Sequence, residues 1–284
     1  VLKDFSWDLN INFAKNANKV KRLANGIDEF ELASARWLGV KVVAKVGENY
    51  GCIMGKDFLR NENGDIIIDG TTGLPKMTDD LKVLGNATWD WTGGLTTNFR
   101  YKNISLGAIF DVKVGADLYS MSARSAYSTG KHKETLEGRE GWYRSEEKRL
   151  AAGVAPKKWK PTGGYIAKGV IKQADGTYKP NDIYVNPQEY WSYVTTQTAR
   201  PFIYDNSYVK LRELTLSYAF PKQMLGKVVN SLSISFVARN LFNIYKNVPN
   251  IDPDSNYNNG TGMGLEFGSL PSRRSFGLNV NLKF

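Results

Sequence analysis

The sequence predicts an all-β protein of the transmembrane antiparallel β-barrel class, and three features lead to that prediction. Apolar and polar residues alternate over six segments, the connections between these segments are alternately long and short, and aromatic residues gather near both ends of the segments. Successive side chains of a strand point to opposite faces, so each segment has one apolar and one polar face. Outer-membrane barrels combine such strands with short periplasmic turns and long outer loops.

The composition excludes several other classes. The 284 residues include 38 Lys and Arg against 28 Asp and Glu, giving a formal net charge of +10, with 42% hydrophobic and 12% aromatic residues. Such a chain is too apolar to be disordered, and no window approaches the ~20 apolar residues of a membrane-spanning helix. A single cysteine, Cys52, and a single histidine, His132, exclude an internal disulfide framework and a Cys/His metal cluster.

The first three strands follow in order along the chain. In 5–13 the apolar residues Phe5, Trp7, Leu9, Ile11 and Phe13 alternate with polar ones. The second and third strands, 89–101 and 104–114, flank the pair Lys102-Asn103, so we expect a hairpin with a tight turn there.

The last three strands are predicted at 208–220, 232–242 and 274–284. In the first of them Val209 and Leu211 have the opposite parity from Leu214 and Leu216, so we predict a β-bulge near Arg212. The final segment alternates without interruption, with its apolar residues at Phe276, Leu278, Val280, Leu282 and Phe284.

The connections complete the prediction. The long ones, 14–88, 115–207 and 243–272, are expected to be extracellular loops, whereas the short ones lie at the periplasmic end. Six strands do not close a barrel, and open edges are costly in lipid. We therefore expect the chain, which opens at Val1 without a signal-like segment, to be part of a longer barrel. A soluble β-sandwich is the alternative, but its loops are usually shorter.

Two aromatic girdles are the third feature. One set falls near the predicted periplasmic ends of the strands and the other near their outer ends, as membrane interfaces favour. The inner set is Trp7, Tyr101, Tyr218, Phe220 and Phe284, and the outer set is Phe13, Trp89, Trp91, Tyr208 and Phe276.

Several segments resemble the carboxyl end of the SusC/RagA family of TonB-dependent outer-membrane transporters of Bacteroidetes. The most specific are Ile-Asp-Pro-Asp at 251–254 and Leu-Pro-Ser-Arg-Arg-Ser-Phe-Gly at 270–277, and the stretches 79–91, 208–218 and 235–242 also match. The resemblance runs from about Asp4 to the end and is loosest in 115–207.

The resemblance implies a barrel of ~22 strands with a plugged lumen, of which residues 1–284 would be the carboxyl-terminal portion. The plug domain and the TonB-contacting segment would lie upstream. It further implies import of oligosaccharides or peptides across the outer membrane of a Gram-negative bacterium. The partners would be a SusD-like surface lipoprotein, the remaining N-terminal barrel and plug, and TonB. No catalysis, cofactor or metal is expected.

Aromatic residues of the 115–207 connection are candidates for ligand binding. Aromatic faces and neighbouring amides are common in sites for polar ligands, although such residues also pack long loops. The candidates are Trp142, Tyr143, Trp159, Tyr190, Trp191 and Tyr193.

Three further features have modest interpretations. The basic run from Lys131 to Lys160 would face lipopolysaccharide or an acidic lid, and no nucleic-acid-binding module accompanies it. A short helix is predicted at 134–149, although Gly138 and Gly141 weaken it. The alternating oxygen donors at 252–258 lack the glycine and glutamate of a calcium loop and predict a turn, as do the glycines at 260–264.

The last strand carries a separate prediction. A final amphipathic strand that ends in an aromatic residue resembles the signal by which the barrel-assembly machinery recognises its clients, here Phe276, Leu278, Val280, Leu282 and Phe284. Two other functions remain open: a receptor for a chelated metal or vitamin, and a surface binding module without transport.

Overall fold

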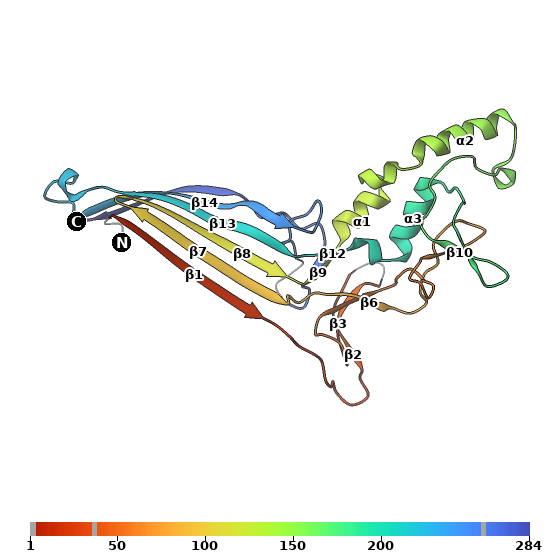
Figure 1. Cartoon of the computed structure of the whole chain (residues 1–284), viewed down its shortest axis with the longest axis horizontal. Coiled ribbons are helices and arrows are strands. Elements are labelled where there is room, and N and C mark those ends of the chain that lie inside the picture. Colours follow the sequence, from red (N-terminus) through yellow and green to blue (C-terminus); the bar gives the residue numbers. More distant parts are fainter. Residues whose placement is uncertain (1–3, 36–38, 257–259) are drawn as a thin grey trace.

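A long six-stranded antiparallel sheet runs through the computed structural model, which describes residues 4–35, 39–256 and 260–284. Its strands pair in chain order, and the beginning of the first strand and the end of the last lie at the same end of the sheet (Figure 1). The strands are β1 (Phe5–Lys15), β7 (Trp91–Tyr101), β8 (Ile104–Val114), β13 (Tyr208–Ala219), β14 (Ser231–Lys246) and β16 (Ser275–Lys283). Strands are therefore present at all six predicted places. The second begins two residues later than expected, and the fifth extends four residues further.

The register places the apolar residues of neighbouring strands on one face. Phe99 of β7 pairs with both Trp7 and Leu106, and Phe236 of β14 pairs with both Leu216 and Leu278. Every residue of β1 and β16 is exposed, so no layer of the described chain covers this apolar face. A soluble sandwich would have buried it.

Two irregularities of the sheet follow from local sequence. The β7–β8 turn is tight, with Lys102 at φ +52°. The register of β13 shifts between Leu211 and Glu213 against both β8 and β14, which confirms the bulge predicted near Arg212. The extra residue restores the apolar face on both sides of the shift.

The long connections, which we expect to be extracellular loops, contain strands and helices of their own. The first one, 14–88, holds a four-stranded antiparallel sheet in the order β2-β3-β4-β6. Its strands are β2 (Glu29–Ser34), β3 (Lys41–Lys45), β4 (Cys52–Gly55) and β6 (Lys82–Asn86). They are only four to six residues long, and in β3 and β4 the buried positions run consecutively, as Val42, Val43 and Ala44 do in β3. Strict alternation is therefore absent from them.

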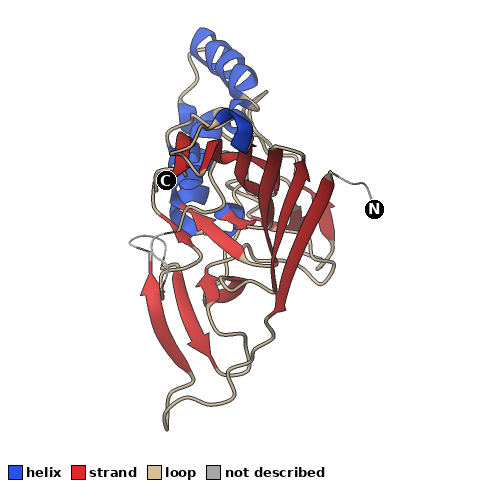
Figure 2. Cartoon of the chain, turned by 90° about the vertical axis from the view of Figure 1, so that its left-hand side faces the viewer, coloured by secondary structure: helices blue, strands red, loops and turns tan. Residues whose placement is uncertain are grey.

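The second connection, 115–207, contains helices, although strands predominate in the described residues as a whole. The helices are α1 (Met121–Ser128), α2 (Arg139–Ala151) and α3 (Pro187–Gln197), and they gather in the upper part of the molecule (Figure 2). Four short 3₁₀ turns lie at 133–136, 156–158, 200–202 and 222–224. The helix predicted at 134–149 instead begins at Arg139, because the backbone of Gly138 has φ +79°, outside the helical region. The position also requires glycine, since a Cβ there would lie 2.5 Å from the backbone nitrogen of Tyr165.

Short strands join the three long connections to each other. One three-stranded sheet contains β12 (Ile203–Asp205), β9 (Asp117–Ser120) and β15 (Leu265–Glu266), and the other contains β11 (Tyr178–Pro180), β10 (Val170–Lys172) and β5 (Ile67–Ile68).

The hydrophobic core lies in this body of connections beyond the outer end of the long sheet. One buried cluster joins residues from all three connections, including Ile53, Tyr119, Phe202 and Leu265. The connections therefore form a single packed unit, which we call the outer body. Among the described residues, no helix has the length and apolar content needed to cross a membrane.

Candidate functional site

The polar face of the long sheet is lined by hydroxyl, amide and charged side chains. Ser217 donates a hydrogen bond to Ser235 on the neighbouring strand at 2.8 Å. Nearer the outer body, Glu213 accepts one from Arg239 at 2.7 Å. This arrangement suits a wall exposed to water or to a polar ligand.

A buried lysine ties the third connection to this wall. Lys210 of β13 is 2% exposed, and its ammonium lies 2.6 Å from Asp254 and 3.3 Å from Asp252. It also lies 2.5 Å from the hydroxyl of Ser272. The buried cation is therefore fully compensated, as burial of a charge requires.

Arg212 extends the same network to β8. Its guanidinium bridges Asp111 and Asp254, each at 2.5 Å, and the hydroxyl of Tyr208 donates to Asp254 at 2.8 Å. Burial alone would raise the pKa of Asp254, but hydrogen bonds from Arg212, Lys210 and Tyr208 outweigh it and hold that pKa below its ordinary value. Asp254 is therefore ionised, and it fixes the segment near 252–254 against the sheet.

Glu266 is a second anchor of the third connection. It is 1% exposed and accepts hydrogen bonds from the hydroxyls of Ser120 and Ser122 at 2.8 and 2.7 Å. It also accepts the backbone N–H of Ser122, at the beginning of α1, at 3.1 Å. The third connection is thus held to the sheet at one point and to the helices at another.

Aromatic rings form the core beside the helices. Tyr127 of α1 packs against Trp191 of α3 with ring centroids 4.6 Å apart, and Tyr190 lies 4.4 Å from Tyr165. Burial raises the pKa of Tyr127, and its hydrogen bond to Glu134 raises it further; burial likewise raises that of Tyr190. Both hydroxyls stay protonated at neutral pH.

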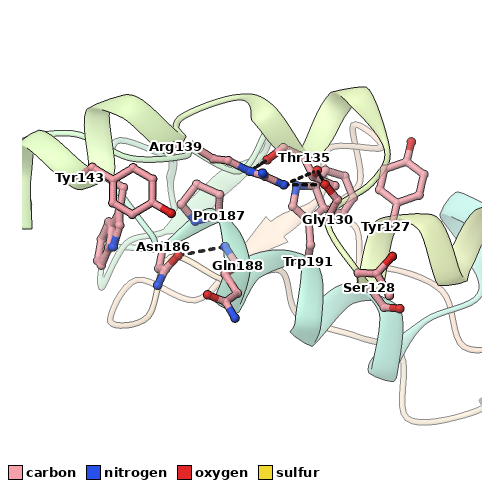
Figure 3. Close-up of a pocket in the computed structure, with 12 residues that line it drawn as sticks. Tyr127, Ser128, Gly130, Thr135, Arg139, Tyr143, Asn186, Pro187, Gln188 and Trp191 are labelled. Carbon is pink, nitrogen blue, oxygen red and sulfur yellow. Dashed lines mark hydrogen bonds between the residues drawn. The ribbon is translucent and has the colours of Figure 1, made fainter.

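A cavity of about 260 Å³ opens among α1, α2 and α3 next to this core. Tyr143 projects from α2 toward Asn186 and Pro187 at the beginning of α3, whereas the guanidinium of Arg139 points toward Thr135 and Gly130 (Figure 3). The full lining is Tyr127, Ser128, Thr129, Gly130, Thr135, Arg139, Trp142, Tyr143, Asn186, Pro187, Gln188 and Trp191. We call it the helical cavity.

Three of the six predicted ligand-binding aromatics, Trp142, Tyr143 and Trp191, line the helical cavity together. The other three lie elsewhere. The indole of Trp159 donates to the hydroxyl of Ser145 at 3.0 Å, Tyr190 lies in the aromatic core, and Tyr193 is partly buried against that core.

The sequence analysis did not select the polar members of the lining. Asn186 caps α3 by accepting the backbone N–H of Gln188 at 2.9 Å, with Pro187 in the first turn. Asn followed by Pro is a common helix-start signal, so the beginning of α3 was readable from sequence. The position of Arg139 in the same lining depends on tertiary packing and was not readable from sequence.

The acidic turn is used for ion pairing. Asp252 and Asp254 contact Lys210, while Asn258, the last oxygen donor of the calcium-like pattern, lies outside the described residues. Among the residues that the structure describes, no group of three His, Cys, Asp or Glu side chains is placed to hold a metal ion.

The residues of the predicted assembly signal share the exposed apolar face of the last strand. Leu278 is 72% exposed and Phe284 75%. Phe276 stacks against Phe236 across the strand pair, with ring centroids 6.0 Å apart. Val280 and Leu282 continue this face toward the terminus.

Comparison with known proteins shows which proteins the chain resembles. TonB-dependent receptor P3 of Formosa agariphila is 26% identical over 309 residues, which cover 99% of this chain and 27% of that receptor. TonB-dependent receptor P26 of the same organism is 25% identical over 316 residues, with the same coverage. No protein-family model matches the chain.

Solved structures show the same fold. The RagAB peptide transporter superposes with a TM-score of 0.63 at 16% identity, covering 100% of this chain and 27% of that chain. The RagAB peptide importer in its open-open state gives 0.59 at 18% identity, covering 99% and 27%. The chain is thus similar over 99% of its length to curated TonB-dependent receptors, shares the fold of the RagAB transporter, and spans about a quarter of the length of these proteins. These relatives are receptors and transporters, not enzymes.

Proposed function

We propose that this segment of a TonB-dependent receptor forms wall and outer loops of a barrel that imports oligosaccharides or peptides across the outer membrane of a Gram-negative bacterium. The observation that carries the proposal is the long sheet itself. Its six strands, nine to sixteen residues long, expose one apolar face along the whole sheet and present hydroxyls, amides and ion pairs on the other.

The apolar face fits a bilayer. Tilted strands of ~9–11 residues cross the hydrocarbon layer, and aromatic rings favour its two interfaces. Trp7 stacks on Phe99 near one end of the sheet, with ring centroids 5.6 Å apart. Near the other end, the ring centroids of Phe13 and Trp91 lie 4.6 Å apart. Hydrocarbon would cover the leucines and isoleucines between them.

The outer body fits the extracellular side. In a SusCD-type complex it would face the SusD-like lipoprotein that covers the barrel, and its basic residues, such as those of α2, would meet lipopolysaccharide. The plug and the TonB contact belong to the remaining part of the longer protein.

The test uses the full-length receptor in its native host. We expect the purified protein to be monodisperse only in detergent, to co-purify with a SusD-like lipoprotein, and to support growth on a glycan or peptide source only when TonB is present. A protein that stays monodisperse in plain buffer would contradict the barrel. Uptake of a chelated metal or vitamin without a lipoprotein partner would instead support that receptor class.

A further inference from the structure

The helical cavity has the chemistry of a binding site for one acidic sugar residue. We propose that it binds a saccharide unit carrying a carboxylate or sulfate group, as part of a larger glycan. The inference deepens the proposed import function, because it names a cargo class and the place where the outer body would first hold it.

The size and the walls of the cavity suit a single ring. Its volume of about 260 Å³ lies just below the roughly 300–1,000 Å³ typical of sites for drug-sized ligands. Trp142 is partly buried, whereas Tyr143 is 66% exposed at the rim. Such rings offer flat apolar surface to the C–H face of a sugar.

The charge of the lining selects an anion. Arg139 is the charged member of the lining, and no carboxylate accompanies it. Its Nε donates to the carbonyl of Thr135 at 2.6 Å, and its Nη2 donates to the carbonyl of Gly130 and the hydroxyl of Thr135 at 2.8 and 2.7 Å. These partners hold the guanidinium in place without neutralising it.

The neighbouring arginines of α2 behave differently. Arg144 and Arg149 pair with Glu140 and Glu146, four and three residues away along the same helix. Arg139 has no ion pair within the described chain, and its Nη1 has no hydrogen-bond partner there. The amino-terminal end of α3, whose backbone dipole also favours negative charge, contributes Asn186, Pro187 and Gln188 to the same lining.

The remaining polar groups fit sugar hydroxyls better than a peptide. The hydroxyls of Ser128 and Thr129 donate to the carbonyl of Ser125 at 3.0 and 2.7 Å, so their oxygens remain as acceptors. Gln188 offers an exposed side-chain amide, and Asn186 retains its amide N–H groups. The lining includes no strand, so an extended peptide would find no edge on which to add its backbone.

A second cavity near the helical cavity has a lining of different charge, which suits an anionic sugar less well. It lies beside the same Tyr127 and Trp191 but is lined by Glu134 and Glu137, with Lys168 as its cation. The hydroxyl of Tyr127 donates to Glu134 at 2.7 Å. Its two carboxylates would repel an anionic sugar, so we assign the ligand to the helical cavity.

The experiment measures binding of three matched probes to the full-length receptor in detergent by isothermal titration calorimetry. The probes are methyl glucuronide, methyl glucoside 6-sulfate and methyl glucoside. We expect at least one of the two anionic probes to bind about tenfold more tightly than the neutral one, because a charge-assisted hydrogen bond is worth more than a neutral one. Added salt should weaken the binding of the anionic probes and leave the binding of the neutral probe unchanged.

Two variants locate the site. Tyr143→Ala should lower the affinity for the anionic probe several-fold. Leu150→Ala is its matched control, since Leu150 is also 66% exposed and lies two turns further along α2 outside the lining. Arg139→Gln should abolish the preference for the anionic probe, while Arg139→Lys should retain part of it.

Each contrary result has a definite meaning. Equal affinity for all three probes, or an unchanged affinity in Tyr143→Ala, would overturn the inference. Tighter binding of an acidic dipeptide than of either anionic sugar would overturn the saccharide assignment. Intact import with no binding of any probe would refute only this site, whereas intact binding without import would refute only the proposed function.

Discussion

At the scale of single residues, Asp254 shows how the outer body is held to the wall. It receives hydrogen bonds from Lys210, Arg212 and Tyr208 on β13. Asp254→Asn would leave the buried Lys210 short of negative charge, so we expect it to lower the free energy of unfolding by about 3 kcal/mol. Denaturant unfolding of the purified full-length protein in detergent measures this loss.

The matched control is Glu140→Gln, which breaks an exposed pair with Arg144 and should change stability little. The effect of Asp254 should also depend on pH. Its pKa is lowered in the folded state, so its contribution is complete above about pH 4, the ordinary carboxyl range, and declines as the pH falls further. A difference between wild type and Asp254→Asn that is the same at pH 3 and pH 7 would contradict this role.

At the scale of elements, β16 tests which solvent covers the sheet. Leu278 lies near the middle of the strand on the apolar face, opposite Phe236. Leu278→Arg would place a cation in the hydrocarbon layer, so we expect the barrel to lose ~2–4 kcal/mol of stability in a folding titration. Asn279→Arg, on the polar face one residue away, is the control and should cost much less. Equal effects of the two variants would show that neither face meets lipid.

The long strands were predictable because a single environment acts along each face. From Phe276 to Phe284 every second residue meets the same surroundings, so the alternation is visible in the sequence alone. The bulge at Arg212 was predictable for the same reason, since it is the point where the parity changes. These signals depend on local geometry and need no knowledge of distant contacts.

The outer body was not predictable in the same way. Its strands are short, and their faces are set by packing among three distant connections, as when β15 at Leu265 pairs with β9 at Tyr119. The helical cavity was not predictable for the same reason, since distant segments form it. Trp142 and Trp191 were selected as aromatic residues near amides, but their position in one lining with Arg139 depends on how α2 and the beginning of α3 pack around the cavity.

At the scale of the whole molecule, the sheet has two outer edges, on β1 and β16, that pair with no other described strand. Unpaired backbone groups in hydrocarbon cost several kcal/mol each, so the barrel proposed above requires further strands against both edges. In that proposed barrel, β16 would pair with the strand that closes it, and its apolar face would be available to the assembly machinery until then.

In such a barrel we expect Phe284 to have a role in assembly that is separate from its contribution to stability. Its ring is 75% exposed at the end of β16, so removing it deletes little packing within the chain. We expect deletion of Phe284 to lower the amount of heat-modifiable barrel in the outer membrane several-fold, because the assembly machinery would no longer recognise the terminal strand, whereas Phe284→Tyr should restore it. If the deletion assembles as well as wild type, Phe284 is only an interfacial anchor, and recognition must depend on the apolar face from Phe276 to Leu282.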